Sequence, residues 1–490
     1  LWATPFRPAA GALLGAGFGM ALVLAAAETS PLAGLFLLVG LAVTAAVLLS
    51  PALGLLLTAA LVPIERLGRL TDDSSMYTFS LMRVAGVLAL GSFLLHGLKR
   101  RSRFRLGAEI LLYAAYLGFA LLTVLYTTDR LGTIRACGAI LGNLLFFFLV
   151  VNAVRSFRLA RAMVAVWLAV SLARAGYTVY AWHLGPEAPD ETSIGKTESR
   201  GSTVWQDTSE WESLASVRRA MGPTSHAAVY GINLVLTLPF FLYFQRTSPR
   251  LSVKVALGAA LALILYNVLL TNTRAVILLA AIVLALAVAW RMVPLSIPRV
   301  AGAILLSALL LPFVPQQISA RVLDLSNYTY RGSGTFRIRL EYWGAALGVF
   351  ERNWLGGVGV GNQNEIPRYL KEEGPEQTSA HNTYLQTLME VGVAGGALFF
   401  GFVGLVFWRA ARAGALFRRR EGRGERYWFL VACQIATLAV LINGLQVDVF
   451  HFPLKGWWLA AGLGAALYGV AREEAAGQPW ETASGARTPS

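Results

Sequence analysis

Charged residues and cysteines are both scarce in this sequence. Only 14% of its 490 residues are charged, against about 25% in a typical soluble domain. Apolar residues make up 56%, and the mean hydropathy is +0.57. A soluble chain of this length needs charge to cover its surface, so the composition indicates a polytopic membrane protein. The two cysteines, Cys137 and Cys433, lie in apolar runs, which excludes a disulfide scaffold and a cysteine metal site.

Several catalytic and ligand-binding motifs are also missing. The chain has no His-Glu-x-x-His zinc motif, no Gly-x-Ser-x-Gly nucleophile elbow and no Asp-x-Asp pair in its predicted outer loops. Its five histidines show no metal-ligand spacing. We therefore expect no bound metal and no cofactor.

Long apolar runs are abundant. A membrane helix needs roughly 20 apolar residues to cross the hydrocarbon layer. A shorter apolar stretch, 51–63, is separated from the preceding run because the Ser50-Pro51 step disfavours a continuous helix. We predict an all-α fold with about 12 to 14 transmembrane helices in one membrane domain, residues 1–472. The clear runs are 9–27, 31–49, 79–97, 107–126, 134–152, 162–181, 226–244, 255–273, 275–290, 300–315, 389–408, 428–447 and 453–471.

The net charge of +15 is distributed unevenly. In a soluble protein this excess would indicate nucleic acid. Here the basic residues gather in short connections that alternate along the chain, which by the positive-inside rule face the cytoplasm. We therefore expect membrane lipids as partners of these residues and no nucleic acid, with a disordered cytoplasmic tail at 473–490. The basic connections are 99–105, 155–161, 246–254, 291–299 and 409–426.

Two long connections, 182–225 and 316–388, fall on the outer side, and loops of this length are usually functional. In the second loop an amphipathic helix is predicted to end at Phe350. Further on, Thr383 and Gln386 fit a capping box, which places His381 just before a helix N-terminus. A helix N-terminus lowers the pKa of a nearby imidazole, and a neutral imidazole can accept a proton from a hydroxyl. The simpler alternative is a polar residue that bonds the backbone at a helix cap.

The same loop has a glycine cluster: Gly356, Gly357, Gly359 and Gly361. It forms either a tight turn or a segment whose backbone N–H groups approach phosphate oxygens.

Arginines near or within the apolar runs are a further signal. Arg83 and Arg174 lie inside runs, whereas Arg219 and Arg274 lie at the predicted outer boundary. A charge within a span is costly and usually faces a polar cavity or a partner, unless it snorkels to the lipid headgroups. Several guanidinium groups that converge on one outer cavity would suit a diphosphate. Asp448 and His451, in a short outer connection, are additional candidates for this site.

These stretches resemble the bacterial O-antigen ligase/polymerase superfamily over about residues 219–395. Ser225-His226 departs from the pattern, since the superfamily often has Pro-Asn there. The matching stretches are Arg219-Ala-x-Gly222, Thr273-Arg274-Ala, Arg339-x-x-x-Trp343, Gly357-Val-Gly359-Val-Gly361-Asn362 and His381-Asn-x-Tyr384-Leu-x-x-Leu-x-Glu390-x-Gly392.

The resemblance implies a membrane glycosyltransferase of the type-C class in the bacterial inner membrane, with its active site facing the periplasm. The implied donor is a glycan on undecaprenyl diphosphate. The acceptor is lipid A–core oligosaccharide in a ligase, or a second lipid-linked glycan in a polymerase; transfer is expected to be inverting and metal-independent. A ligase is preferred because one dominant loop carries His381. A ligase with a protein acceptor and a transporter of lipid-linked glycans remain alternatives.

The resemblance also implies roles for individual residues. His381 is the expected base, and Arg219 and Arg274 are expected to neutralise the departing diphosphate. Arg339 is expected to orient the loop or contact the donor, and Glu390 to orient His381 or an arginine. The remaining candidates for substrate binding are Arg83, Asn382 and Tyr384, with Gly357, Gly359 and Gly361 as loop glycines.

Overall fold

The computed structural model describes residues 30–64, 80–99, 104–184, 205–206, 219–222, 227–294, 334–362, 364–370, 379–448 and 454–476. Helices account for most of them, which confirms the all-α class. The one strand pairing in these ranges is a two-residue antiparallel match of β1 (Trp205–Gln206) with β2 (Arg219–Ala220). The predicted spans 9–27 and 300–315, most of the loop 182–225 and the part of the predicted tail beyond 476 lie outside the described residues. The predicted tail of 473–490 begins too early, because residues 473–475 belong to the last helix, Lys455–Ala475.

The helices follow the predicted runs closely. They are α2 (Pro31–Leu49), α3 (Pro51–Leu61), the 3-10 turn η1 (Val62–Ile64), α4 (Leu81–Lys99), α5 (Ala108–Thr123), α6 (Arg130–Ala153), α7 (Phe157–Leu184), α8 (Ala227–Val235), α9 (Leu238–Thr247), α10 (Leu251–Leu270), α11 (Arg274–Ala289), α14 (Gly334–Arg352), α15 (Glu365–Leu370), α16 (Thr383–Glu421), α17 (Glu425–Asn443) and α18 (Lys455–Ala475).

The chain is a multi-pass membrane protein. Seven helical segments within the described ranges are long and apolar enough to cross a membrane, and four more apolar helices are shorter. The total of about 12 to 14 spans stays a prediction, because two of the predicted spans lie outside these ranges.

One predicted span contains a break. The run 226–244 corresponds to the apolar segment Ala227–Thr247, which is long enough to cross a membrane and consists of α8 and α9 with a break at Leu236 and Thr237. Pro239 supplies the physical reason, since proline lacks an N–H and its ring clashes with the carbonyl four residues earlier. The Thr237 hydroxyl donates to the Leu234 carbonyl at 2.6 Å and so satisfies part of the interrupted backbone.

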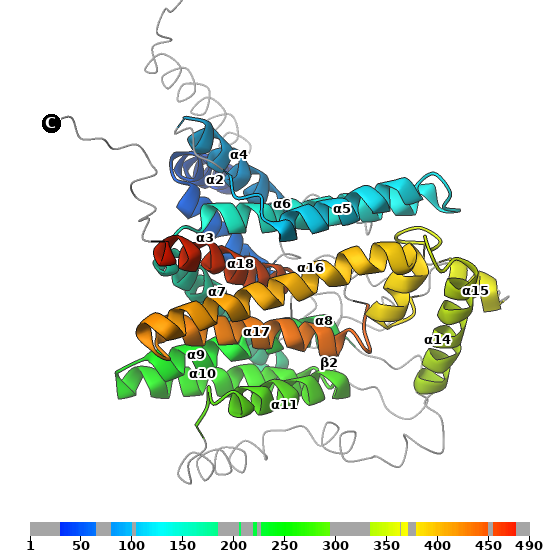
Figure 1. Cartoon of the computed structure of the whole chain (residues 1–490). Coiled ribbons are helices and arrows are strands. Elements are labelled where there is room, and N and C mark those ends of the chain that lie inside the picture. Colours follow the sequence, from blue (N-terminus) through cyan, green and yellow to red (C-terminus); the bar gives the residue numbers. More distant parts are fainter. Residues whose placement is uncertain are drawn as a thin grey trace, which may run out of the picture.

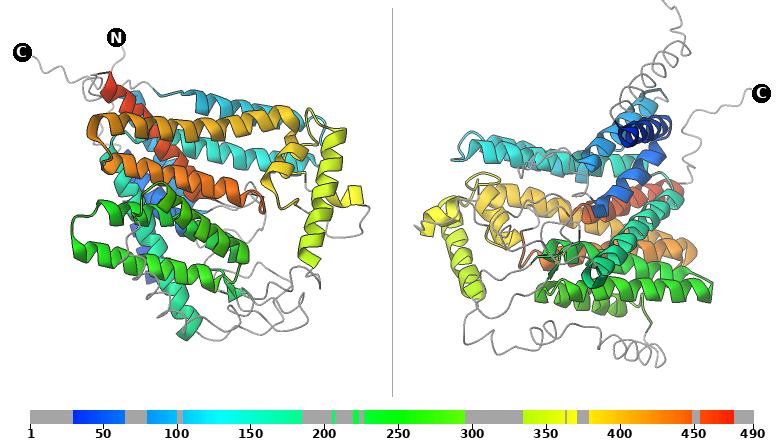
Figure 2. Two further views of the ribbon diagram at one scale, coloured as in Figure 1. Left: turned by 60° about the horizontal axis from the view of Figure 1, so that its bottom comes forward. Right: turned by 180° about the vertical axis from the view of Figure 1, so that it is seen from behind.

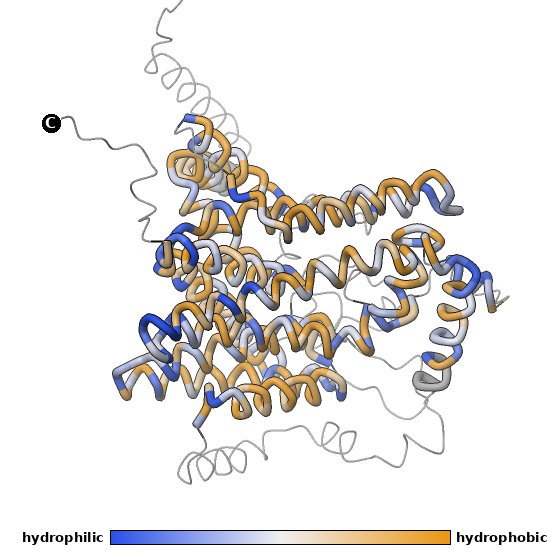
Figure 3. The backbone as a smooth tube through the Cα atoms, viewed as in Figure 1, coloured by the Kyte–Doolittle hydropathy of each residue, from blue (hydrophilic) through white to orange (hydrophobic). Residues whose placement is uncertain are grey.

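Basic connections meet at one end of the bundle, which we call the basic end. Arg105 forms a bidentate contact with Glu473 of α18, with Nη2 to Oε2 at 2.5 Å, and Arg426 contacts Glu474 at 2.8 Å. Arg409 of α16 pairs with Glu109 of α5. Figure 3 shows the hydrophilic residues collected toward the helix ends, with hydrophobic segments between them. The predicted alternation of basic connections therefore agrees with the packing.

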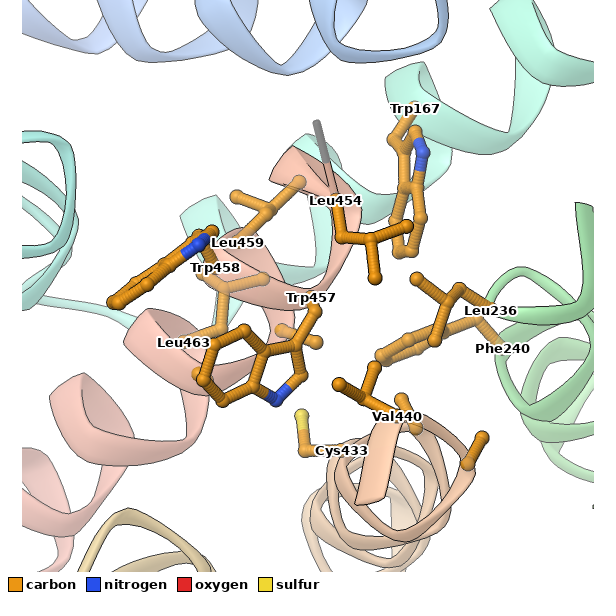
Figure 4. Packing of buried hydrophobic residues seen from close by; sticks show 14 of the residues in the cluster. Trp167, Leu236, Phe240, Cys433, Val440, Leu454, Trp457, Trp458, Leu459 and Leu463 are labelled. Carbon is orange, nitrogen blue, oxygen red and sulfur yellow. The ribbon is translucent and has the colours of Figure 1, made fainter. Parts of the chain in front are cut away.

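Close contact between helices holds the bundle together. A membrane provides little hydrophobic drive for helix association, so packing and small residues matter most. A Cβ atom added at Gly462 of α18 would lie 2.8 Å from the Val150 side chain of α6, and one at Gly464 would lie 3.1 Å from Ala410 of α16. Figure 4 shows large side chains filling the adjacent core, including Trp167, Phe240, Trp457 and Trp458.

Helix α16 organises the end opposite the basic end, which we call the loop end. It packs on α5, α17 and α18 along its length and on α14 near its start. Helices α14 and α15, both from the second long loop, stand across the first turns of α16, at the right of Figure 1 and in both views of Figure 2.

Candidate active site at the start of α16

The first turn of α16 is capped by Asn382. Its Oδ1 accepts hydrogen bonds from the backbone N–H groups of Tyr384 (3.0 Å) and Leu385 (3.1 Å), as in a standard N-cap. The predicted capping box of Thr383 and Gln386 is therefore wrong. Asn382 is the N-cap residue because its side-chain oxygen reaches two N–H groups that have no partner within the helix. The Thr383 hydroxyl instead donates to the Val447 carbonyl at 2.7 Å.

The last turn of α17 and the segment after it hold this turn in place. Asn382 Nδ2 donates to the Leu445 carbonyl at 3.2 Å, and Thr383 N–H donates to the Gly444 carbonyl at 2.7 Å. The Tyr384 hydroxyl donates to the Leu441 carbonyl at 2.7 Å. Residues far apart in the chain thus fix the N-terminal turn of α16.

The peptide group that leads into His381 is held on both sides. Trp343 Nε1 of α14 donates to the Ala380 carbonyl at 2.9 Å, and His381 N–H donates to Ser379 Oγ at 3.2 Å. On the other side of Ala380, its N–H donates to Gln386 Oε1 at 2.9 Å. The position of His381 is therefore set by α14 and α16 together.

His381 has a left-handed backbone, with φ of +49°. Its side chain is half-buried, and burial lowers the pKa of the imidazole below its ordinary value. The nearby positive charge of Arg339 lowers the pKa further. Arg339 lies one helical turn before Trp343 on α14, so both side chains are on the face that meets residues 380–381. The imidazole is therefore neutral near pH 7 and able to accept a proton.

Glu390 and Gln386 connect this turn to the glycine cluster. Gln386 Nε2 donates to Glu390 Oε1 at 2.7 Å, and the Gly361 N–H also bonds the Glu390 carboxylate. The Glu390 side chain is only 3% exposed. The Gln386 side chain therefore links Glu390 by hydrogen bonds to Ala380, the residue before His381.

The glycine cluster lies against a break in α16. Gly392 has non-helical backbone angles inside the helix, which leaves carbonyl groups before it and N–H groups after it without helical partners. The segment 354–359 satisfies both sets, because backbone groups in a packed region need hydrogen-bond partners. The bonds are Val358 N to Met389 O (3.0 Å), Gly359 N to Glu390 O (2.9 Å), Val393 N to Trp354 O (2.8 Å) and Ala394 N to Leu355 O (3.2 Å).

The backbone of this segment lies so close to neighbouring atoms that only glycine fits at several positions. Gly357, Gly359 and Gly361 all have positive φ, between 69° and 110°. A Cβ atom at Gly357 would lie 2.3 Å from the Glu390 backbone, and one at Gly359 would lie 2.5 Å from Thr127 Oγ1. Of the two alternatives for this cluster, the geometry favours the tight structural turn, since the N–H groups of Val358, Gly359 and Gly361 already have protein acceptors.

The same segment is anchored on the turn between α5 and α6. Asn362 Nδ2 donates to Thr128 Oγ1 at 2.9 Å, and the Tyr126 hydroxyl donates to the Gly356 carbonyl at 2.7 Å. Sequence reasoning missed this turn, because nothing in residues 126–128 signals a partner more than 200 positions away.

Arg219 lies on β2, which packs beside α8 and α10. Gly222, three residues later, has φ of +53°, and a Cβ there would lie 2.6 Å from the ring of Tyr230. On α7, the guanidinium of Arg174 stacks over the Tyr230 ring at 4.6 Å and donates to the Pro63 carbonyl. Arg174 is therefore buried among protein groups instead of snorkelling, and it supports the ring on which Gly222 rests.

Arg274 is the first residue of α11, a helix that packs on α8 and α17. Two buried amides lack hydrogen-bond partners within the described part of the chain, one two residues before Arg274 and one on α17. Asn272 (φ +46°) and Asn443, at the C-terminal end of α17, are each 1% exposed, and their side chains have no hydrogen-bond partner among the described residues. Buried amides are costly unless a ligand or water satisfies them.

The other candidates differ in placement. Arg83 is exposed on α4, which packs on α2, α3 and α6, and α4 lies apart from α14 and the start of α16 in Figures 1 and 2. Asp448 is buried and accepts from Ser379 Oγ at 3.4 Å, so it does join the His381 neighbourhood. His226 and His451 lie outside the described residues. Within the described part of the chain, no three His, Cys, Asp or Glu side chains are grouped as a metal site.

Part of the chain matches a known protein family. Residues 224–400 match the family described as O-antigen ligase. The match includes Arg274, Arg339 and His381 and begins just after Arg219. It supports placement of the chain in the O-antigen ligase/polymerase superfamily, as predicted, and therefore a membrane enzyme of ligase or polymerase type. No curated protein is similar enough to match the chain.

Proposed function

We propose that this O-antigen ligase-type chain is an inverting, metal-independent glycosyltransferase. It moves a glycan from undecaprenyl diphosphate to lipid A–core oligosaccharide at the periplasmic face of the inner membrane. One membrane domain, residues 1–472, carries the reaction. The main support is His381, whose neutral imidazole is held at the start of α16 by contacts from α14 and from the segment after α17.

In the proposed reaction His381 accepts the proton of the acceptor hydroxyl. The hydroxyl oxygen forms a bond to the anomeric carbon while the bond from that carbon to the diphosphate oxygen breaks. The diphosphate leaves with both bonding electrons. Arg219 and Arg274 stabilise its charge, because guanidinium groups bind phosphate oxygens in a bidentate fork.

Other residues position the reacting groups. Arg339 keeps His381 neutral and is available to contact the donor, and Asn382 and Tyr384 hold the turn that carries the base. Glu390 acts through Gln386 and the glycine segment rather than on substrate. Arg83 is not part of the proposal, because its helix lies apart from His381.

The test is transfer by the purified protein from a polyprenyl-diphosphate glycan. Loss of the general base should lower the rate by about 10²- to 10⁴-fold in His381→Asn. Asparagine tolerates positive φ, so this change removes the base and keeps the backbone. His183→Ala is the matched control, because His183 ends α7 at the loop end and bonds only Tyr266 among the described residues. Full activity in His381→Asn would exclude His381 as the base.

The choice of acceptor separates the candidate functions. Transfer to lipid A–core identifies a ligase, whereas extension of a second lipid-linked glycan identifies a polymerase. Absence of any product, together with measurable flipping of the donor, would favour a transporter.

A further inference from the structure

A pocket of about 450 Å³ lies at the basic end, far from His381. It is formed by the first turns of α7, the end of α9 and the start of α17. Its lining residues are Phe157, Arg158, Arg161, Ala162, Ala165, Phe244 and Glu425.

The pocket carries an excess of positive charge. Arg158 and Arg161 are three residues apart on α7, so they share one face. The side chain of Arg158 is exposed and has no partner among the described residues. Arg161 Nε contacts Glu425 Oε1 at 2.9 Å, yet half of the Arg161 side chain (50%) stays exposed.

The acidic member of the pocket is already engaged. Glu425 Oε1 accepts from Arg161 and also from the buried Tyr243 hydroxyl, at 2.9 Å. Its negative charge is therefore balanced within the protein, and Arg158 is left to bind an external anion. The N-terminus of α7 adds a partial positive charge at the same place.

The rest of the lining is apolar. Phe157 and Phe244 contribute aromatic rings to the lining, and Arg161 is stacked over the Phe244 ring at 5.5 Å. Ala162 and Ala165 continue from the arginines toward the middle of α7, and Ala165 is exposed on this membrane-crossing helix. Small side chains beside a charged site leave room for a hydrocarbon chain.

We propose that this pocket binds the headgroup phosphate of an anionic phospholipid, with an acyl chain along Ala162 and Ala165. Basic pockets between transmembrane helices suit such headgroups, and each arginine contributes about fivefold in affinity. A free phosphate ion shares the anionic chemistry but makes no use of the alanine surface. The proposal is independent of the glycosyltransferase assignment.

The experiment measures lipid retention by the purified full chain in phosphatidylcholine nanodiscs that contain a minor share of phosphatidylglycerol, using native mass spectrometry. We expect the wild type to retain phosphatidylglycerol preferentially and Arg158→Gln to lose about fivefold in affinity. Arg419→Gln is the matched control, because Arg419 is exposed at the same end, outside the pocket. Ala162→Phe fills the pocket without a change of charge and should also abolish the preference.

Three results would overturn the proposal. One is equal retention of the two lipids by the wild type. Another is equal loss in Arg158→Gln and Arg419→Gln. The third is displacement of phosphatidylglycerol by millimolar inorganic phosphate, which would identify a simple anion site. A melting temperature in phosphatidylcholine alone verifies that each variant is folded.

Discussion

Replacement of Gly357 by alanine tests whether the glycine segment repairs the break in α16. Gly357 has φ of +69°, and an added Cβ would lie 2.3 Å from the carbonyl carbon and oxygen of Glu390. These are backbone atoms, which cannot rotate away as a flexible side chain does. The segment must therefore move away from the helix.

The magnitude follows from what that movement breaks. A left-handed backbone costs alanine about 1–2 kcal/mol. Displacement also breaks the bonds from Val358 N to Met389 O and from Gly359 N to Glu390 O, each worth about 1 kcal/mol. Together these terms predict a loss of about 3–4 kcal/mol of stability.

Gly356 provides a matched control. It is the preceding residue, its φ is not positive, and the nearest atom to an added Cβ is the Tyr126 hydroxyl at 3.2 Å, the end of an exposed side chain. We expect Gly356→Ala to change stability by less than about 1 kcal/mol.

Thermal unfolding of both variants in detergent, with transfer activity measured beside it, distinguishes them. Gly357→Ala should melt at lower temperature and lose activity, because the break at Gly392 is only ten residues beyond Asn382. Equal melting temperatures for the two alanine variants would refute the proposal that the glycine segment stabilises the break in α16. They would favour the alternative that the glycines approach phosphate oxygens.

Three further changes probe the site. Asn382→Ala should cost about 1–2 kcal/mol in thermal stability, with partial recovery in Asn382→Asp; unchanged melting would contradict the cap. The acidic limb of the kcat/KM profile should lie below pH 6.5, since His381 must lose its proton and burial and Arg339 both lower its pKa. Removing the positive charge in Arg339→Gln should move that limb to higher pH, whereas Arg352→Gln on the same helix should not. Arg274→Lys keeps the charge but loses the bidentate fork, so kcat/KM should fall roughly 10- to 100-fold; Arg130→Lys, also at the first position of a helix, is its control, and equal effects would contradict the assignment.

Apolar runs and basic connections were sufficient to predict the helices, because a membrane imposes a minimum span length and an asymmetric distribution of charge. The same criteria missed two interruptions. Pro239 can be read from the sequence, but the apolar run around it predicts a continuous span. The structure has a break between α8 and α9 there. Gly392 is a weaker signal in the sequence, because many helices tolerate a single glycine. The break is stable because the segment 354–359 bonds the backbone groups that it exposes.

Within the site, the local sequence correctly predicts that a helix starts beside His381, but it predicts the wrong capping residue. Thr383 and Asn382 are both good capping residues, and the choice depends on Val447, whose carbonyl engages the Thr383 hydroxyl. A residue 64 positions away cannot be anticipated from a capping pattern. The same limit applies to Trp343, whose bond to the Ala380 carbonyl fixes the peptide before His381.

The glycine motif and the histidine motif are therefore one structural unit. A continuous helix from Thr383 onward would leave the N–H groups of Val358 and Gly359 without their acceptors, because only the break at Gly392 exposes the Met389 and Glu390 carbonyls. Conversely, Glu390 is held by Gly361 and by Gln386, and Gln386 also holds Ala380, the residue before His381. The proposed base, His381, must lie within hydrogen-bond reach of the hydroxyl it deprotonates, so we expect a shift in the glycine segment to reach it through the side chains of Glu390 and Gln386. Substitutions at Gln386 should accordingly lower kcat more than they alter donor binding.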